Sequence, residues 1–499
     1  MSVLLMAVVV PGMNIQVTLD LAGIAWVRYW NATLLVAVGS GLVFAVVYVL
    51  SGRRIALTLR ITASLVFVFF LWPLFSRVDV VGGAVGALLV VLAPFVIIYA
   101  AARYGDRAAV VLPMVVLASV VFIGVGYQAL GRGIGEPQYD QFEPIAASPT
   151  VANPDVLMVL LDGYARDDVL QNDYGYDNSG FLGALSRSGF VVNPNTSANY
   201  TRTYASLGSV MDLDYPVPAG PISDETNAEL RMLLEQSGSL VNSFVERGYD
   251  ITVAESAWYG SHCGPLVDHC WRESTTRSSA YYLSLLTPIA PVVQANVPHP
   301  FHTTSWNQLL DLSASFTAAA DRSNPQFMFV HLDLPHPPLN LDASCNLRYE
   351  SWRHGLILAA DADGQDQESI RRRAAYVEQT ECVNATLMEE LAGILAAFPD
   401  TSVLLFSDHG PDGRGQLRAQ LHETTQEGLY ERLGILSAAR TPEHCDGFES
   451  ALTLVNVVRG FTGCVLSLEL GPLPDHSFWV PSQSSPAPVV EVELSNRSS

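Results

Sequence analysis

Apolar residues are distributed unevenly along the chain, and the N-terminal part has the pattern of a membrane protein. Uncharged apolar stretches, long enough or nearly long enough to span a bilayer as helices, occupy residues 31–51, 61–76, 80–102 and 108–131. Residues 1–13 contain a shorter apolar run. This run lacks the basic start of a signal peptide and precedes further spans, so it is a candidate fifth span. The pattern predicts a transmembrane helix bundle of four or five spans over residues 1–130.

Arginines between the apolar stretches predict the orientation of the bundle. Arg53, Arg54 and Arg60 separate the first two full-length stretches, and Arg103 and Arg107 separate the last two. Because cytoplasmic loops carry the excess of basic residues, both connections are expected in the cytoplasm. The chain then leaves the last helix on the extracytoplasmic side of the cell membrane. The alternative, a buried helical domain of a soluble protein, does not explain this charge bias.

The rest of the chain has the pattern of a separate α/β domain. Residues 131–154 are rich in Gly, Pro and acidic residues and predict a linker. Short apolar runs alternate with amphipathic stretches over residues 155–478, which predicts a central, mostly parallel sheet covered by helices. One such stretch, 367–396, predicts a long amphipathic helix. Residues 479–499 are expected to form a tail with at most one edge strand.

Composition narrows the range of partners and indicates the compartment. The formal net charge is −22, and all 27 basic side chains are arginines. This balance argues against nucleic acid as a partner, because phosphate backbones are bound by clustered cations. An even number of cysteines, all after the apolar region, indicates disulfides in an oxidising compartment. They are Cys263, Cys270, Cys345, Cys382, Cys445 and Cys464.

The pairing of the cysteines remains open at this stage. Pairing neighbours in sequence is the simplest connectivity, but other pairings fit the same count. His262-Cys263 and His269-Cys270 also have the composition of a Cys₂His₂ zinc site. Adjacent ligand pairs are poor geometry for one metal, so a disulfide is the favoured interpretation.

Three apolar runs of the α/β domain end in unusual polar residues. The run 156–161 ends at Asp162-Gly163, and the run 403–406 ends at Ser407-Asp408-His409-Gly410. The run 327–332 leads into Asp333 and Pro335-His336-Pro337. Ligand sites in open α/β sheets form beyond the carboxyl ends of strands. A single Asp after a strand is usually a turn former, but three such endings together indicate a functional site.

A fourth segment, Asn199-Tyr-Thr-Arg-Thr203-Tyr-Ala-Ser206, follows turn-forming residues and precedes helix-compatible ones. Thr203 is therefore expected at or near a helix N-terminus, where free amides and the helix dipole favour negative charge. The alternative role for Thr203 is that of a helix-capping residue.

Together these residues resemble the alkaline-phosphatase superfamily. Asp162 after a strand, Thr203-x-x-Ser206, Pro-His-Pro and Ser-Asp-His-Gly look most like its sulfatase-like branch with lipoteichoic acid synthases and phosphoethanolamine transferases. The resemblance covers residues 155–478. It implies a sulfatase-like (alkaline-phosphatase superfamily) α/β fold, with membrane helices joined to an outer catalytic domain.

The resemblance also implies the residues of a site for one divalent metal, Zn or Mn, namely Asp162, Thr203, Asp408 and His409. His336 and His422 would contact the phosphate; for His422 the alternative is a surface histidine. Asp333 with His336 would supply part of a second metal site. Sulfatases carry Cys or Ser as the nucleophile, in a Cys/Ser-x-Pro-x-Arg context. Thr203-Tyr-Ala-Ser-Leu departs from that context and favours phosphorus over sulfate chemistry.

The leading hypothesis is a transferase with Thr203 as the nucleophile, since coordination by a metal lowers the pKa of a hydroxyl. It would move a phosphoglycerol or phosphoethanolamine type group from a membrane phospholipid donor to a cell-envelope glycan or lipid acceptor. Several spans hold the domain at the lipid headgroups, whereas a hydrolase of soluble substrates needs one anchor. The alternatives are a phosphodiesterase or phosphatase that uses water, and a non-catalytic envelope protein.

Overall fold

The computed structural model describes part of the chain in detail. The described residues are 44–50, 52–55, 57–58, 61, 154–256, 261–271, 300–320, 324–347, 367–413, 421–441, 445, 448–481 and 487–494. The chain forms two compact units. One consists of residues 1–138 and 274–300, and the other of residues 139–273 and 301–499.

Little of the first unit belongs to the described residues. Residues 44–50 form a helix within the predicted span 31–51, and the side chains of Val46, Val49 and Leu50 are exposed. The predicted spans 1–13, 80–102 and 108–131, and 61–76 apart from its first residue, lie outside the described residues. Within the described ranges, no helix has both the length and the apolar character required to cross a membrane.

The second unit is built on a seven-stranded sheet with the order β2-β7-β6-β1-β5-β3-β4. Its strands are β1 (Val156–Leu161), β2 (Val191–Val192), β3 (Asp250–Ala254), β4 (His269–Trp271), β5 (Gln326–Leu332), β6 (Ser402–Phe406) and β7 (Ser437–Arg440). Four neighbouring pairs are parallel: β6-β1, β1-β5, β5-β3 and β3-β4. Strand β7 pairs antiparallel with both of its neighbours, β2 and β6. The predicted α/β domain with a mostly parallel sheet is confirmed.

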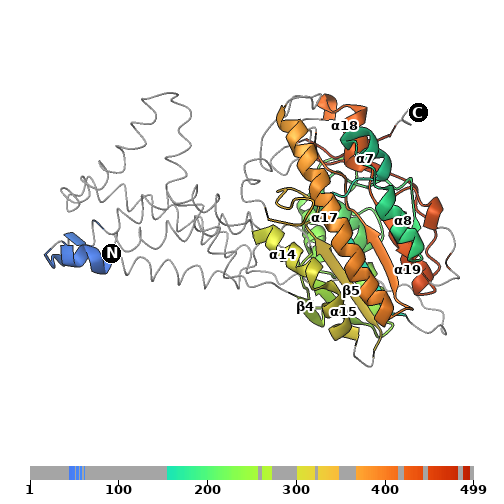
Figure 1. The fold of residues 1–499 in the computed structure, drawn as a ribbon, viewed down its shortest axis with the longest axis horizontal. Helices are drawn as coiled ribbons and strands as arrows, with labels where there is room; N and C mark the ends of the chain where they lie inside the picture. Colours follow the sequence, from blue (N-terminus) through green and yellow to red (C-terminus); the bar gives the residue numbers. More distant parts are fainter. Residues whose placement is uncertain are drawn as a thin grey trace. The chain divides into compact units, whose positions relative to one another are not determined.

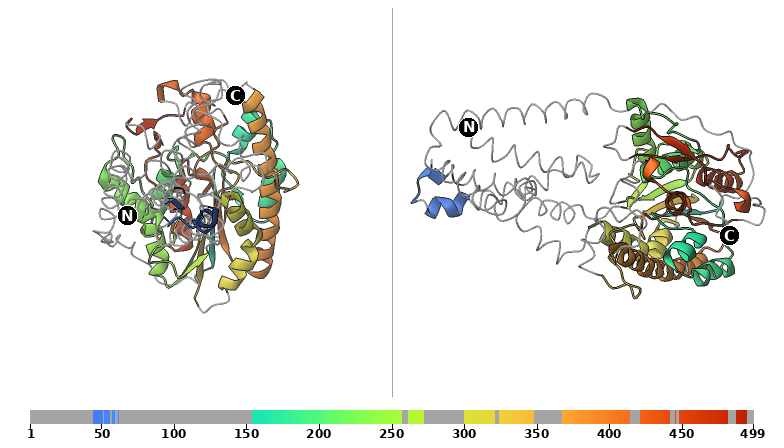
Figure 2. Two further views of the ribbon diagram at one scale, coloured as in Figure 1. Left: turned by 90° about the vertical axis from the view of Figure 1, so that its left-hand side faces the viewer. Right: turned by 90° about the horizontal axis from the view of Figure 1, so that it is seen from above.

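Helices cover both faces of the sheet. They are α7 (Asp167–Tyr174), α8 (Ser179–Arg187), α9 (Thr203–Asp212), α10 (Asp224–Leu234), α11 (Ser239–Val245), α14 (Pro300–Leu310), α15 (Leu312–Ala320), α17 (Gln367–Ala397), α18 (Gln426–Leu433) and α19 (Leu454–Val465). The described residues also include two short 3-10 helices, η4 (Leu421–Glu423) and η5 (Phe448–Ser450). Helices α7, α8 and α15 each contact α17 on one face of the sheet, and α9, α10, α11 and α19 lie on the other (Figures 1 and 2).

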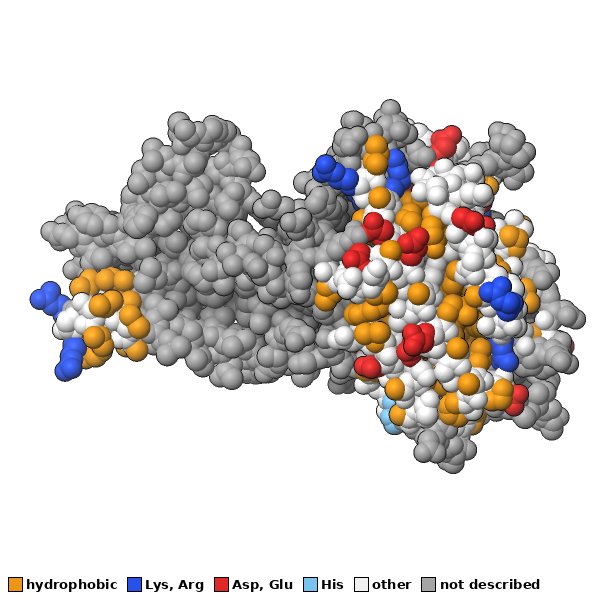
Figure 3. Space-filling model, in the orientation of Figure 1, with side chains coloured by type: hydrophobic (Ala, Val, Ile, Leu, Met, Phe, Trp, Pro, Cys, Tyr) orange, Lys and Arg blue, Asp and Glu red, His pale blue; other side chains and the backbone are white. Residues whose placement is uncertain are grey.

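The long helix α17 confirms the amphipathic helix expected at 367–396. Tyr376, Val383, Leu387 and Leu391 recur at helical spacing and are buried against the sheet. On the outer surface around α17, acidic and hydrophobic side chains are interspersed (Figure 3). One face of α17 therefore supplies the core and the other meets solvent.

Strand alternation determines which residues share a face of the sheet. In β5, Met328 and Val330 pack with α17 and its neighbours, whereas Phe327 and Phe329 pack with α9 and α19. Since successive side chains of a strand point to opposite faces, His331 falls on the face that α9 covers. The same alternation, continued past the ends of β1, β5 and β6, brings Asp162, Asp333 and Asp408 to that face.

The C-terminal segment packs on the second unit. Strand β8 (Ser477–Trp479) pairs antiparallel with β9 (Val490–Val492). Phe478, Val480 and Val489 are buried in a small cluster with Tyr200. The segment expected to be a tail thus contributes one strand, and its apolar residues stabilise the turn that precedes α9.

The structure forms the three disulfides of the simplest connectivity: Cys263–Cys270, Cys345–Cys382 and Cys445–Cys464. Within the described part of the chain there is no free cysteine. The disulfides agree with the oxidising compartment expected from the cysteine count.

The Cys345–Cys382 disulfide joins the loop after β5 to α17 across a separation of 37 residues. Replacing both cysteines by serine should lower the free energy of unfolding by about 4 kcal/mol, because a loop of this length gains chain entropy when unfolded. Urea unfolding followed by circular dichroism measures the difference. An unchanged midpoint would contradict a structural role for this disulfide.

Candidate active site

The turn after β1 positions Asp162. The backbone N–H of Asp162 donates to Leu332 O at 3.0 Å, which extends the pairing with β5 by one residue. Gly163 follows with φ +74°, a conformation that L side chains rarely adopt, and its N–H donates to Asp408 Oδ1 at 3.2 Å. This hydrogen bond joins the turn after β1 directly to the carboxylate that follows β6.

The loop after β6 directs His409 toward the same point. His409 Nδ1 lies 3.0 Å from Gly410 O. Because a carbonyl oxygen only accepts, Nδ1 is the protonated nitrogen, and Nε2 is left with its lone pair. That Nε2 lies 3.2 Å from Asp408 Oδ2 and 3.7 Å from Asp162 Oδ1.

Thr203 reaches this group from a segment of the chain that is separate from the three strand ends. It is the first residue of α9, and its Oγ1 lies 3.0 Å from His409 Nε2. Arg202 at the N-cap position makes no side-chain capping hydrogen bond. The N-terminus of α9, with its amides and dipole, therefore favours an anion next to the Thr203 hydroxyl.

The carboxylates of this group fit a divalent cation. Candidate ligand atoms of Asp162, Asp408 and His409 all lie within 4.8 Å of one another. Asp162 Oδ1 and Asp408 Oδ2 are buried and have no hydrogen-bond partner. Burying two such oxygens without compensation is costly, and a cation bound between them would remove that cost. The set of two carboxylates, one imidazole and one hydroxyl suits Zn²⁺ or Mn²⁺.

The electrostatics of the group are strongly perturbed. Burial and the charge of Asp162 raise the pKa of Asp408 to about 7. Burial also acts to raise the pKa of Asp162, but interactions with His336, His331 and His409 lower it below its usual range. Burial and the nearby charge of Arg432 lower the pKa of His409 well below its usual value. Perturbation of this kind is typical of functional sites, and it keeps His409 neutral and able to bind a metal.

Arg432 in α18 was not anticipated from the sequence. Its Nη1 donates to Gly410 O at 2.7 Å and its Nε donates to Thr201 O at 2.9 Å. One buried guanidinium thus holds the loop after His409 against the turn before Thr203. No local motif marks this residue, because its two partners are distant in sequence.

Replacing Arg432 by lysine should loosen both loops. An ammonium cannot reproduce two divergent N–H donors, so at least one buried carbonyl loses its partner. We expect the free energy of unfolding to fall by about 2 kcal/mol, as measured by urea denaturation. Arg231→Lys, at an exposed position of α10, is the matched control and should leave stability unchanged. Equal stability of the two variants would contradict the bridging role.

His336 lies at the rim of the group. Its backbone N–H donates to Asp162 O at 2.9 Å, and its ring centroid is 6.1 Å from that of His409. Its Nδ1 lies 2.6 Å from Pro337 O, which leaves Nε2 available. The side chain is half-buried, so His336 has access to a bound substrate.

His422 is not brought to this group. It lies in η4 with its side chain 73% exposed, and its Nε2 is 3.9 Å from Glu423 Oε1. Among the described residues, no contact joins it to Asp162, Asp408 or His409. The structure therefore gives no support to a contact between His422 and the phosphate, and that role remains a prediction.

A second group adjoins the first. His331 Nε2 lies 3.6 Å from Asp162 Oδ2 and 4.0 Å from Asp333 Oδ1. Asp333 accepts hydrogen bonds from Ser256 and Ser305 in this group, and its expected part in a second metal site with His336 remains a prediction. Sequence reasoning missed His331 because it lies inside the apolar run of β5, where a histidine is usually a core residue.

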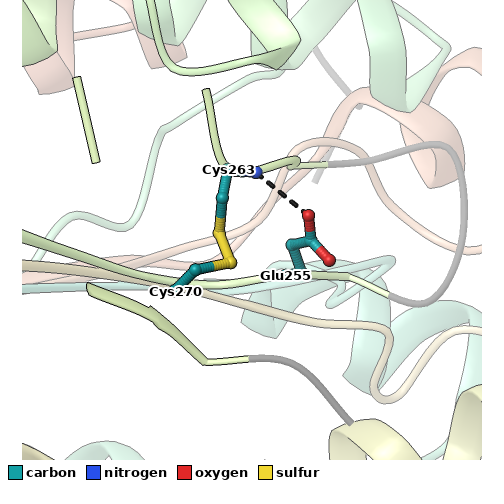
Figure 4. A group of neighbouring side chains, drawn as sticks. All are labelled: Glu255, Cys263 and Cys270. Carbon is teal, nitrogen blue, oxygen red and sulfur yellow. Dashed lines mark hydrogen bonds between the residues drawn. A yellow bond between two sulfur atoms is a disulfide. The ribbon is translucent and has the colours of Figure 1, made fainter. Parts of the chain in front are cut away.

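The cysteine-rich loop does not bind zinc through its thiols. Cys263 and Cys270 form a disulfide, and Glu255 Oε1 accepts a hydrogen bond from the Cys263 N–H at 3.1 Å (Figure 4). Sulfurs in a disulfide are not thiolate ligands. The favoured disulfide interpretation is confirmed over the Cys₂His₂ site.

Comparison with solved structures gives distant matches to both transferases and hydrolases. The C-terminal periplasmic domain of EptC from Escherichia coli is 12% identical, with a TM-score of 0.45 over 70% of this chain and 96% of that one. Lipooligosaccharide phosphoethanolamine transferase A from Neisseria meningitidis is 12% identical, with a TM-score of 0.39 over 91% and 95%. Phosphonate monoester hydrolase of Agrobacterium radiobacter is 13% identical, with a TM-score of 0.43 over 65% and 80%.

Comparison with known sequences identifies a family model that matches the chain, but no individual curated protein that does. No curated protein matches the chain. The sulfatase family model matches residues 154–444, more than half of the chain. This range contains the strand ends, the start of α9 and the two groups of acidic and histidine side chains. The chain therefore belongs to the sulfatase family, in the alkaline-phosphatase superfamily of metal-dependent enzymes.

Proposed function

We propose that this protein is a membrane-anchored transferase that moves a phospho-alcohol group, of phosphoglycerol or phosphoethanolamine type, from a membrane phospholipid to a cell-envelope acceptor. The observation that carries the proposal is the place of Thr203. Its hydroxyl is at the N-terminus of α9 and 3.0 Å from His409 Nε2, beside two buried carboxylates. A hydroxyl needs such surroundings to act as a nucleophile at neutral pH.

Asp162, Asp408, His409 and Thr203 would hold one divalent metal. When bound there, the metal would lower the pKa of the Thr203 hydroxyl and offset the negative charge of the phosphoryl oxygens. The N-terminus of α9, with its helix dipole, would hold the phosphoryl group of the donor beside Thr203 Oγ1. Arg432 keeps the loop of His409 and the turn of Thr203 in register during the reaction.

The reaction would proceed in two transfers. In the first, Thr203 Oγ1, having lost its proton, would form a bond to phosphorus, the bond from phosphorus to the glycerol oxygen of the lipid would break, and diacylglycerol would leave with a proton carried to its oxygen by His336 Nε2. In the second, a hydroxyl of the acceptor would give its proton to His336 Nε2 and attack the phosphothreonine. The bond from phosphorus to Thr203 Oγ1 would then break, which returns Thr203 Oγ1 and His336 to the protonation states in which they started.

The domain organisation proposed from the sequence fits this substrate. Residues 1–130 would form the membrane helices, 131–154 the linker, 155–478 the extracytoplasmic catalytic domain, and 479–499 a C-terminal segment. Several spans would hold the catalytic domain beside lipid headgroups. Disulfides in the second unit support an oxidising, extracytoplasmic location.

The proposal predicts diacylglycerol as a product. The full-length protein in detergent, loaded with Zn²⁺ or Mn²⁺, should release diacylglycerol from labelled phosphatidylglycerol or phosphatidylethanolamine. In the presence of acceptor glycan or lipid, the labelled headgroup should appear on the acceptor. Release of free phospho-alcohol or phosphate at the same rate without any acceptor would replace the transferase by a phosphodiesterase or phosphatase that uses water. No turnover of either lipid would contradict the proposed donor.

A further inference from the structure

The turn that precedes α9 is hydrogen-bonded to the C-terminal segment of the chain. Tyr200 forms an isolated parallel bridge with Phe478 of β8, and the two rings stack with their centroids 5.2 Å apart. The Thr201 N–H donates to Phe478 O at 3.1 Å, and the Phe478 N–H donates to Asn199 O at 2.7 Å. The backbone just before the proposed nucleophile is therefore paired with β8.

The side chain of Thr201 extends this pairing to Val480. Thr201 Oγ1 accepts a hydrogen bond from the Val480 N–H at 2.9 Å and donates to Val480 O at 3.4 Å. Arg202 Nε also donates to Val480 O, at 3.3 Å. Thr201 is 2% exposed and Val480 is 1% exposed. Removing the Thr201 hydroxyl would therefore cost the Val480 N–H this hydrogen bond, in a place shielded from the water that could replace it.

The same turn is held on its other side by α9 and α18. Arg202 O accepts hydrogen bonds from the N–H groups of Ala205 and Ser206, in the first turn of α9. Arg432 Nε, in α18, donates to Thr201 O at 2.9 Å. Thr201 is thus held through its N–H and its hydroxyl by the C-terminal segment, and through its carbonyl by α18.

The proposed nucleophile follows directly from this turn. Thr203 is two residues beyond Thr201, and its Oγ1 lies 3.0 Å from His409 Nε2. A shift of about 1 Å in a reacting atom can slow a reaction roughly 100-fold, so the backbone that carries Thr203 must be held accurately. Residues 477–480 lie beyond the range 154–444 that the sulfatase family model matches, so the family assignment does not account for this contact.

We propose that the C-terminal segment 477–480 holds the turn before α9 in its reactive position, and that Thr201 is a positioning residue for Thr203. Thr201 acts through the backbone, by fixing the point from which the Thr203 side chain projects. The segment is itself held by the pairing of β8 with β9 and by the burial of Phe478 and Val489. This role rests on the proposed function, in which Thr203 is the nucleophile.

Thr201→Val tests this role, because valine keeps the shape of threonine and removes its hydroxyl. The full-length protein in detergent, with Zn²⁺ or Mn²⁺, is assayed for headgroup transfer from labelled phospholipid. We expect kcat to fall at least about tenfold with KM unchanged. Thr201→Ser restores the hydroxyl and should recover most of the rate. Thr462→Val, at a buried threonine of α19, is the matched control and should keep the full rate. An unchanged kcat in Thr201→Val would overturn the proposal.

Hydrogen–deuterium exchange tests the contact without a variant and without turnover. In the unmodified protein, peptides that cover residues 199–202 and 477–480 should both exchange at least about 100-fold more slowly than an unstructured chain. Both should exchange faster in Thr201→Val and at the same rate in Thr462→Val. Fast exchange of either peptide in the unmodified protein would overturn the proposal. Slow exchange in an unmodified protein that turns over no lipid would refute only the proposed function.

Discussion

Replacement of Thr203 by alanine is expected to abolish headgroup transfer while leaving the fold intact. The variant loses the only oxygen proposed to bond to phosphorus, and water does not substitute efficiently for an oriented nucleophile. By analogy with nucleophile removal in other covalent enzymes, we expect the rate of diacylglycerol release to fall on the order of 10⁴-fold or more. The measurement is the initial rate with labelled phospholipid.

Two controls separate loss of the nucleophile from loss of structure. Thr203→Ser keeps a hydroxyl and should retain measurable activity. Thr226→Ala changes a threonine at the corresponding end of α10, where Thr226 interacts with Ser223, and should leave the rate unchanged. A Thr203→Ala protein with full activity would remove Thr203 from the mechanism.

Loss of the metal is the second change expected to have a large effect on the rate. Removing the metal with a chelator should abolish turnover, and adding Zn²⁺ or Mn²⁺ should restore it. Asp408→Asn should prevent the restoration, because the amide cannot supply the anionic oxygen that Oδ2 provides, beside His409, in the buried group. We expect at least a roughly 10³-fold loss of rate for this variant at saturating metal, a magnitude similar to that of removing one electrostatic stabiliser.

The matched control for this variant is Asp177→Asn. The exposed Asp177 accepts a hydrogen bond from the Ser179 N–H, which an asparagine side chain can also do. Its activity should be unaffected and should respond to chelation like the unmodified protein. Activity that survives exhaustive chelation would contradict a metal-dependent mechanism in any form.

Much of the fold was predictable because the relevant signals are local. The runs 156–161, 327–332 and 403–406 correspond to β1, β5 and β6, which differ from them by no more than one residue at a boundary. Buried parallel strands are continuous apolar runs, and the polar residue after each marks where it ends. Asp162, Asp408 and His409 were identifiable for that reason. Thr203 was identifiable from the turn-forming residues before α9.

Contacts between residues distant in sequence could not be predicted from the sequence. His331 is one residue from the end of an apolar strand, and only the sheet order places it beside Asp162. Arg432 acts through two backbone carbonyls in separate loops, which no motif encodes. His422, expected at the site, has an exposed side chain in the structure, and its contact with the phosphate remains a prediction.

The residue proposed as the nucleophile stands in a sequence context that differs from the one expected of sulfatases. Thr203 has neither the proline nor the arginine of the Cys/Ser-x-Pro-x-Arg context in the residues that follow it. In the structure its hydroxyl lies 3.0 Å from His409 Nε2, a member of the group formed by Asp162, Asp408 and His409. This arrangement supports the proposed attack of a hydroxyl on phosphorus.

The proposed phosphothreonine can be detected by mass spectrometry of the protein after brief incubation with phosphatidylethanolamine or phosphatidylglycerol and metal, without acceptor. We expect a phosphoethanolamine or phosphoglycerol adduct on the peptide that contains Thr203. This adduct should disappear when acceptor is added and should be absent from Thr203→Ala. Turnover of the lipid with no adduct on Thr203, or with the adduct on another residue, would contradict Thr203 as the nucleophile.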